Sequence, residues 1–143
     1  MNSVLVDTNV WVDIVLKRPD FFEDSFGAVM ACIEEGMRIF VVGTSVKDVF
    51  YWAEKSAGPE AGYRALNMLF DIADVAAVDA AVCKGALELE RPDYEDGIIA
   101  ACARAEQVDA ILSRDAAAFA NASAPKYAPR AFLSHMGYEQ IEF

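Results

Sequence analysis

Short apolar runs alternate with longer segments in which apolar residues recur every three or four positions, a pattern that predicts strands alternating with helices. The predicted strands cover residues 3–6, 38–42, 74–78, 110–112 and 125–128. The predicted helices cover residues 10–16, 22–35, 79–90, 93–106 and 129–136, and two more begin near Thr44 or Ser45 and at Pro59. Because alternating strands and helices form parallel sheets with helices on both faces, we expect an α/β fold. Its architecture is predicted to be a three-layer α/β/α sandwich with a roughly five-stranded parallel sheet.

Polar residues and prolines support several of these boundaries. Asp79 and Asp93 stand at the cap positions of two predicted helices, where an Asp side chain can accept hydrogen bonds from free amides of the first turn. Pro59 suits a first helical position, and Pro92 ends the helix before it. No element is predicted for residues 138–143.

Length and composition limit the architecture further. The chain has 143 residues, a mass of 15.6 kDa and 55% hydrophobic residues, which suits a single domain over 1–143 with a core of its own. No apolar run approaches the roughly 18 residues of a transmembrane helix, and the N-terminus lacks the basic region of a secretory signal. We expect a cytoplasmic protein without membrane contact, with Cys32, Cys83 and Cys102 as reduced core thiols.

The chain is strongly acidic, with 23 Asp and Glu against 12 Lys and Arg and a net charge of −11. This balance argues against a nucleic-acid-binding protein that relies on a basic patch. The only histidine is His135, so a His-rich metal site or a His-based catalytic triad is not expected. The acid excess therefore indicates either a soluble, self-repelling surface or a group of acids that converges on a divalent cation.

Four acids are expected at one edge of the sheet, where parallel sheets bind their ligands. Asp7 follows the first predicted strand, Asp48 lies soon after the second, and Asp115 follows the fourth. Asp96 lies in the first turn of a helix whose residues 97–103 are almost wholly apolar or small. An acid at the start of so apolar a helix favours a site over a role in solubility.

Two of these acids have alternative roles as helix caps. Asp7 could cap the helix that follows it, although Asn9 could do this instead. Asp48 comes three residues after Ser45, which is the spacing of a capping box. A capping role and a site role are compatible in both cases.

The acid after the fourth strand has the same two interpretations. Asp115 could cap a short helix over 116–120, and Ser113 could cap it instead or hydrogen-bond a ligand. Carboxylates gathered at one edge repel each other unless a cation neutralises them. Oxygen ligands without His or Cys favour Mg²⁺ or Mn²⁺, whose usual role is phosphate chemistry. The bases next to these acids in the sequence could contact phosphates or be solvated, and they are Lys17, Arg18, Lys47 and Arg114.

Four segments, in this order and spacing, resemble the PIN domain family over nearly the whole chain. They are Leu5-Val6-Asp7-Thr8-Asn9-Val10, Thr44-Ser45-Val46-Lys47-Asp48, Asp93-Tyr94-Glu95-Asp96-Gly97-Ile98-Ile99-Ala100-Ala101-Cys102-Ala103, and Ser113-Arg114-Asp115 with Phe119. The resemblance implies a five-stranded parallel sheet with helices on both sides and a ribonuclease that depends on Mg²⁺ or Mn²⁺. Bacterial members of this length are often VapC-type toxins that a small antitoxin protein blocks.

The resemblance also implies roles for single residues. The family's first, second and third acids correspond to Asp7, Asp48 and Asp96, and its variable fourth acid corresponds to Asp115. Asp7, Asp96 and Asp115 would hold one or two metal ions. Asp48 would orient or deprotonate the water that hydrolyses an RNA phosphodiester.

Two positions depart from the family pattern. The second acid is usually Glu, and Asp48 is one methylene shorter. Ser113 stands where Thr is usual, which keeps the hydroxyl group. We expect Ser113 and Asn9 to support the acids.

Two other functions remain open, and so does the oligomeric state. A receiver domain is also small, acidic and Mg²⁺-binding, but it needs paired acids after the first strand, where Asp7 lies between Val6 and Thr8. It also needs an acceptor after the third strand, where Asp79 fits better as a helix cap. The other alternative is a PIN scaffold that binds partners without catalysis. Because PIN domains commonly pair, a homodimer is also compatible with this apolar chain.

Overall fold

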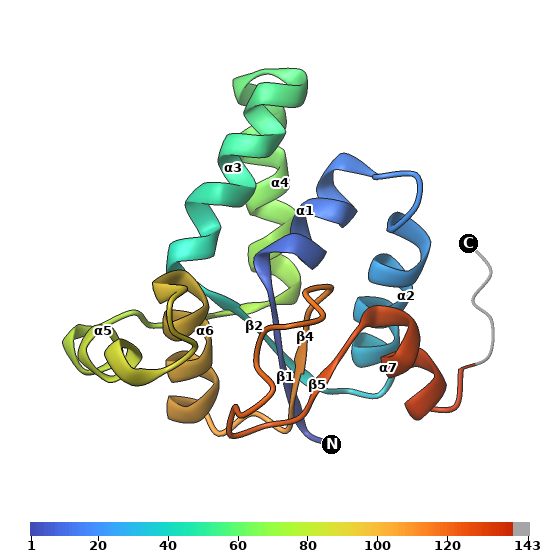
Figure 1. Cartoon of the computed structure of the whole chain (residues 1–143). Coiled ribbons are helices and arrows are strands. Elements are labelled where there is room, and N and C mark those ends of the chain that lie inside the picture. Colours follow the sequence, from blue (N-terminus) through green and yellow to red (C-terminus); the bar gives the residue numbers. More distant parts are fainter. Residues whose placement is uncertain (139–143) are drawn as a thin grey trace.

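Five parallel strands form one sheet in the order β3-β2-β1-β4-β5 in the computed structural model of the chain (Figure 1). The structure describes residues 1–138. The strands are β1 (Ser3–Val6), β2 (Arg38–Val42), β3 (Asp74–Ala76), β4 (Ala110–Leu112) and β5 (Lys126–Tyr127). The helices are α1 (Thr8–Leu16), α2 (Phe22–Glu34), α3 (Gly43–Ala57), α4 (Pro59–Ile72), α5 (Ala80–Gly85), the 3₁₀ turn η1 (Ala86–Glu88), α6 (Tyr94–Ala105) and α7 (Pro129–His135). The predicted α/β class and five-stranded parallel sheet are confirmed.

Side chains of the strands alternate between two hydrophobic cores, one on each face of the sheet. In β1, Val4 and Val6 pack in the core that includes residues of α1, α2, α3, α4 and α7. Leu5 packs in the other core, with residues of α5 and α6. A strand buried on both faces needs apolar residues at every position, which explains the continuous apolar run of β1. The result is the predicted three-layer sandwich.

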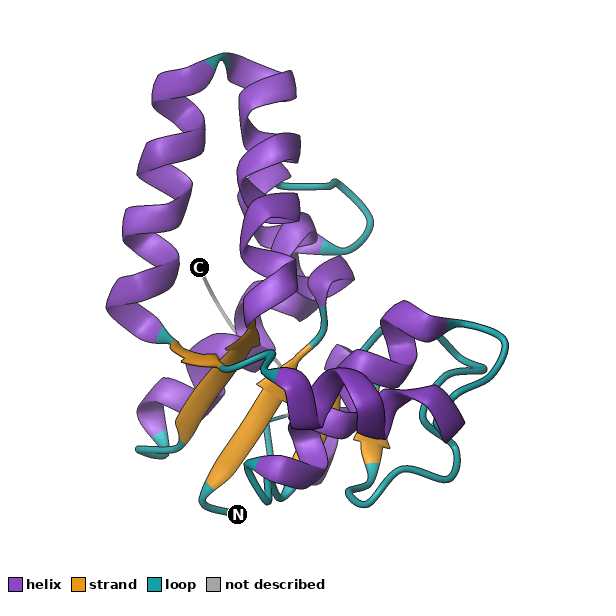
Figure 2. Ribbon diagram, turned by 90° about the vertical axis from the view of Figure 1, so that its left-hand side faces the viewer, coloured by secondary structure: helices purple, strands orange, loops and turns teal. Residues whose placement is uncertain are grey.

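Helices α3 and α4 form a long antiparallel hairpin that stands away from the sheet (Figure 2). Gly58 connects them with a φ of 90°, a conformation that favours glycine. Gly62 lets the two helices approach closely, because a Cβ atom there would lie 2.6 Å from the ring of Phe50. At the base of the hairpin the hydroxyls of Thr8 and Ser45 are 2.6 Å apart and hydrogen-bonded. This contact fixes the first turn of α3 beside the end of β1.

Most predicted helix starts agree with the structure. Pro59 begins α4, and Asp79 and Asp93 are the N-caps of α5 and α6, each accepting a hydrogen bond from a first-turn amide. The helix predicted over 79–90 is divided into α5 and η1. The third and fifth strands are shorter than predicted.

The start of α3 differs from the prediction. The helix begins at Gly43, and Val42 occupies the N-cap position without any side-chain hydrogen bond. Ser45 therefore lies inside the helix and binds the Thr8 hydroxyl instead of a backbone amide. The capping box that was one alternative for Ser45 and Asp48 does not form, which leaves Asp48 without that structural role.

Two further features of the chain are the state of its cysteines and the character of its helices. Cys32 and Cys102 are buried, Cys83 is half-buried, and all three are free thiols. Within residues 1–138, no helix combines the length and apolar character needed to cross a bilayer.

Candidate active site

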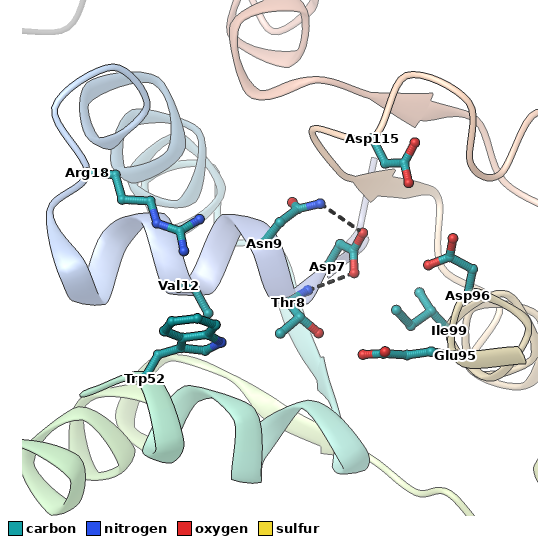
Figure 3. Close-up of a pocket in the computed structure, with 10 residues that line it drawn as sticks. All are labelled: Asp7, Thr8, Asn9, Val12, Arg18, Trp52, Glu95, Asp96, Ile99 and Asp115. Carbon is teal, nitrogen blue, oxygen red and sulfur yellow. Dashed lines mark hydrogen bonds between the residues drawn. The ribbon is translucent and has the colours of Figure 1, made fainter. Parts of the chain in front are cut away.

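The order of strands reverses direction beside β1. From β1 the chain proceeds to β2 and β3 on one side, and it later returns to β4 and β5 on the other. Open parallel sheets bind ligands at such a switch point, beyond the carboxyl ends of the strands. A cleft of about 280 Å³ lies there (Figure 3), and the residues that line it are Asp7, Thr8, Asn9, Val12, Arg18, Trp52, Glu95, Asp96, Ile99 and Asp115.

Asp7 is the most buried acid of this cleft, with 5% of its surface exposed. Its Oδ1 accepts a hydrogen bond of 2.7 Å from the Thr8 amide, which confirms that Asp7 caps α1. Its Oδ2 accepts hydrogen bonds from Ser113 Oγ at 2.7 Å and from Asn9 Nδ2 at 3.3 Å. Burial raises the pKa of Asp7, and the hydrogen bonds from Ser113 and Thr8 oppose this rise. Asn9 and Ser113 thus contact the acid that they were expected to support.

Asp96 faces Asp7 and Asp115 across the cleft (Figure 3). Its amide donates a hydrogen bond of 3.1 Å to Asp93 Oδ1, so Asp93 is the cap and Asp96 lies in the first turn, as predicted. Burial, followed by the charges of Asp93, Asp7 and Asp115, raises the pKa of Asp96 to about 7. Gly97 allows α6 to pack closely against η1, because a Cβ atom there would lie 2.7 Å from the Ala86 carbonyl oxygen.

Asp115 closes a turn after β4. Its Oδ1 accepts hydrogen bonds of 3.0 and 3.2 Å from two amides of the following turn. Residues 116–120 form no helix, so the prediction of a helix cap there is wrong. The Asp115 amide also donates a hydrogen bond of 3.1 Å to Ser113 Oγ. Ser113 therefore connects Asp115 with Asp7 at the ends of two neighbouring strands.

Glu95 lines the cleft, whereas Asp48 does not. Asp48 lies on α3, where its carboxylate is 3.1 Å from Lys47 Nζ and its side chain is 31% exposed. Burial raises the pKa of Glu95, and the charge of Asp48 is the next largest cause, so the two side chains are neighbours. No role for Glu95 could be predicted from the sequence. The signal that it carried was its place beside Asp96 in the first turn of an apolar helix.

Arg114 is directed away from the cleft acids. Its Nε and Nη2 lie 2.5 and 3.0 Å from the two carboxylate oxygens of Asp13, which is fully buried. Ser25 Oγ donates a third hydrogen bond to Asp13 at 3.0 Å. Of the two alternatives left open for Arg114, phosphate contact or solvation, neither describes this buried ion pair.

The acids of the cleft are more numerous than the cations near them, which are Arg18 in its lining and Lys47, whose charge acts on Glu95. Within residues 1–138, no Lys or Arg forms an ion pair with Asp7, Glu95, Asp96 or Asp115. The same part of the chain contains no group of three His, Cys, Asp or Glu side chains arranged to enclose a metal ion. Mg²⁺ commonly keeps several waters and binds through one or two carboxylates together with substrate phosphates. An open, oxygen-only cluster with uncompensated charge fits this kind of binding.

The family model of the PIN domain matches residues 3–117 of the chain. The chain therefore belongs to the PIN domain family, and the resemblance of its four segments is confirmed. A search of curated proteins finds no match.

Solved structures of toxin proteins share this fold. VapBC2 from Rickettsia felis, solved with a DNA fragment from its promoter, superposes with a TM-score of 0.69 at 16% identity and covers 88% of this chain and 98% of that one. A toxin–antitoxin complex from Klebsiella pneumoniae gives 0.67 at 18% identity, with coverages of 88% and 97%. VapC20 from Mycobacterium tuberculosis, described as a toxin that cleaves the sarcin-ricin loop, gives 0.62 at 14%, with coverages of 98% and 99%. At these identities the likeness shows the fold.

Proposed function

We propose that this PIN domain is a divalent-metal-dependent endoribonuclease of the VapC toxin type. The observation that carries the proposal is the convergence of Asp7, Asp96 and Asp115, from three separate elements, on one cleft at the switch point of the sheet. Mutually repelling carboxylates, of which Asp7 is buried, reduce stability in the absence of a cation, so a site that keeps them has a use for their charge. Cleavage of an RNA phosphodiester uses this charge to collect the cation that phosphate chemistry needs.

On this proposal Asp7, Asp96 and Asp115 hold one or two ions of Mg²⁺ or Mn²⁺. When bound, such an ion would act as a Lewis acid that offsets the negative charge of the phosphoryl oxygens. Asn9 and Ser113 hold Asp7 Oδ2 in one orientation through their hydrogen bonds. This support limits the freedom of the most buried ligand before the substrate arrives.

The chemical step is hydrolysis. A water oxygen forms a bond to phosphorus, one ester P–O bond breaks, and the products carry a phosphate monoester and a free hydroxyl. Asp48 orients the water or takes its proton, as the family pattern implies. Glu95 is a second candidate for this role, because it reaches the cleft from α6 beside Asp96 (Figure 3).

A small antitoxin protein is the proposed partner. The structures of similar fold include toxin–antitoxin complexes, and this chain has a surface suited to an apolar segment of such a partner. A groove of about 730 Å³ lies between the α1–α2 and α3–α4 helices and is mostly apolar, with Ile14, Val15, Ala61, Ala65 and Met68 among its lining residues. We place the pair in the cytoplasm, where RNA is available, and a homodimer of the toxin remains part of the proposal.

The receiver alternative conflicts with the sheet. Receiver-type domains have the strand order 2-1-3-4-5, whereas this chain has 3-2-1-4-5. The idle scaffold is the remaining alternative, and activity decides it. We expect the purified protein to cleave single-stranded RNA with Mg²⁺ or Mn²⁺ and not with EDTA. Asp7→Asn should remove cleavage while the protein stays folded.

Two outcomes separate these functions. If the wild-type protein binds Mn²⁺ but cleaves no RNA, the chain is a scaffold. For the partner, the product of any small reading frame adjacent to the gene should form a complex and inhibit cleavage. Met68→Glu, which places a charge in the apolar groove, should weaken this complex without changing cleavage.

A further inference from the structure

The cleft has two unlike sides (Figure 3). Glu95 and Asp96 lie on one side, Arg18 and Trp52 lie on the other, and Asp7 lies between them. The proposed hydrolysis accounts for the acidic side. It gives no role to Arg18, which reaches the cleft from the segment after α1, or to Trp52, which reaches it from α3.

Trp52 is an exposed aromatic residue surrounded by cations. Its side chain lies at the cleft with 38% of its surface exposed, and the neighbouring Tyr51 is 51% exposed. Lys55 Nζ lies 5.3 Å from the centre of the indole, and the guanidinium carbon of Arg18 lies 6.0 Å from it. The rings of Tyr51 and Trp52 meet edge to face at 5.4 Å. Two aromatic rings and two cations thus gather beside the cleft in a chain whose net charge is −11.

We propose that Trp52, Arg18 and Lys55 form a subsite for one nucleotide of single-stranded RNA next to the bond that is cleaved, an inference that rests on the ribonuclease function above. Aromatic rings bordered by Arg and Lys are the usual way in which proteins bind single strands, because every base has an apolar face that can stack. The base stacks on the indole, and Arg18 and Lys55 contact its phosphates. Arg18 is the only cation among the described residues that line the cleft, so this side is the one whose charge is complementary to RNA phosphates.

The subsite gives the cleft a preference for unpaired RNA. In a duplex the bases are stacked within the helix, and they cannot also lie against the indole. A loop or a single-stranded end can supply one unstacked base at low cost. The acids on the opposite side then face the phosphate next to that base.

Replacing Arg18 should disturb the fold little, which keeps the test interpretable. Its contact with the buried Asp13 is 3.4 Å long, near the limit of a hydrogen bond, and Arg114 is the main partner of that carboxylate. Replacing Arg18 therefore leaves Asp13 paired. Tyr63, on the same helical hairpin, is 60% exposed and does not line the cleft, so it supplies a matched aromatic control.

The experiment measures binding of a single-stranded hexaribonucleotide to proteins in an Asp7→Asn background, where the RNA is not consumed. Trp52→Leu should weaken binding roughly fivefold to a hundredfold, Trp52→Phe should retain most of the affinity, and Tyr63→Leu should change nothing. Arg18→Gln should lower the salt dependence, the slope of log K against log salt, by roughly 0.7. A duplex of the same sequence should bind equally weakly to all of these variants.

Tryptophan fluorescence gives a second readout that needs no activity. The chain has two tryptophans, and Trp11 is fully buried, so quenching by the hexaribonucleotide reports stacking on Trp52 and should vanish in Trp52→Leu. Equal affinities for Trp52→Leu and Tyr63→Leu without quenching would overturn the subsite, and quenching by a polypeptide partner alone would assign the patch to protein binding. If Trp52→Leu loses binding while the wild-type protein cleaves no RNA, the subsite stands and the proposed nuclease function fails.

Discussion

Asp13 and Arg114 form an ion pair between a buried carboxylate and a partly exposed guanidinium, and this pair joins α1 to the end of β4. The Asp13 side chain is fully buried, and the Arg114 guanidinium also lies over the ring of Phe21, with its carbon 3.8 Å from the ring centre. Because Arg114 directly precedes Asp115, the pair fixes the backbone beside one acid of the cleft. The Arg114 amide adds to this by donating a hydrogen bond of 3.2 Å to Asn9 Oδ1.

Arg114→Ala should destabilise the protein strongly, because it leaves a buried carboxylate without its main partner. Loss of one member of a buried ion pair costs about 3–5 kcal/mol, and the weaker contact from Arg18 should keep the loss near the lower end. Arg130→Ala, which removes a surface ion pair with Asp24 at 3.6 Å, should cost less than about 1 kcal/mol. Urea unfolding of the two variants compares them. Similar losses would show that the Asp13 carboxylate is not as dependent on Arg114 as its burial indicates.

Asp93 and Asp96 should respond differently to the same substitution. Asp93 binds the Asp96 amide, and Asn caps a helix as well as Asp, so Asp93→Asn should cost little stability and only part of the activity. Asp96→Asn should remove RNA cleavage and most of the stabilisation by Mn²⁺. In the wild-type protein this stabilisation is roughly 2.7 kcal/mol at 100 times Kd, a shift of several degrees in Tm.

Thermal melts with Mn²⁺ and with EDTA, next to RNA cleavage, test this pair. A wild-type melt that is the same with Mn²⁺ and EDTA would mean that the cleft acids bind no metal. An active Asp96→Asn beside an inactive Asp93→Asn would mean that the third acid of the family has been assigned to the wrong residue.

The third prediction separates Asp48 from Glu95. If Asp48 orients the attacking water, Asp48→Asn should lower kcat by roughly 10²–10⁴-fold and leave the Mn²⁺-induced shift in Tm unchanged. Glu95→Gln should then have a smaller effect on kcat. If Glu95→Gln lowers kcat more than Asp48→Asn does, the orientation of the water would be assigned to Glu95, the acid that lines the cleft.

The fourth prediction concerns pH in the metal-free protein. Asp96 has a folded-state pKa of about 7, raised from its ordinary value of 3.8. Between these values the folded state keeps a proton that the unfolded chain has released, so the contribution of Asp96 to stability is lost as pH rises from about 4 to about 7. The free energy of unfolding of the wild type relative to Asp96→Asn should therefore fall over this range. Urea unfolding at several pH values in metal-free buffer measures the difference, and a constant difference would contradict the raised pKa.

The fold could be predicted from the sequence because its main signals are local. The apolar run of β1, the proline that begins α4 and the acids that cap α5 and α6 act on neighbouring residues. Strand order and the geometry of the α3–α4 hairpin depend instead on contacts between residues that are far apart in the sequence. The start of α3 was misplaced because the hydroxyl of Ser45 binds Thr8, a residue far away in the sequence, in place of the nearby amide.

In the candidate site, too, some positions could be predicted from the order of elements and others depend on contacts between distant parts of the chain. Asp7 and Asp115 follow strands, so the edge where they meet followed from the order of elements alone. Whether Asp48 or Glu95 enters the cleft depends on the rotation of α3 and α6 about their axes, which the packing of both helices determines. The direction of Arg114 could not be predicted either, because its partner Asp13 is 101 residues away.

The central position of β1 has a consequence for synthesis of the protein. The hydroxyl that binds Asp7 Oδ2 belongs to Ser113, which is synthesised 106 residues after Asp7. At about 5–20 residues per second, a ribosome needs roughly 5–20 s to cover that separation. Until then the nascent chain has Asp7, and later Asp96 on α6, without the hydroxyl that holds Asp7 Oδ2. A translation product that stops before Ser113 therefore carries Asp7 and Asp96 but lacks Asp115 and the Ser113 hydroxyl that connects Asp115 with Asp7.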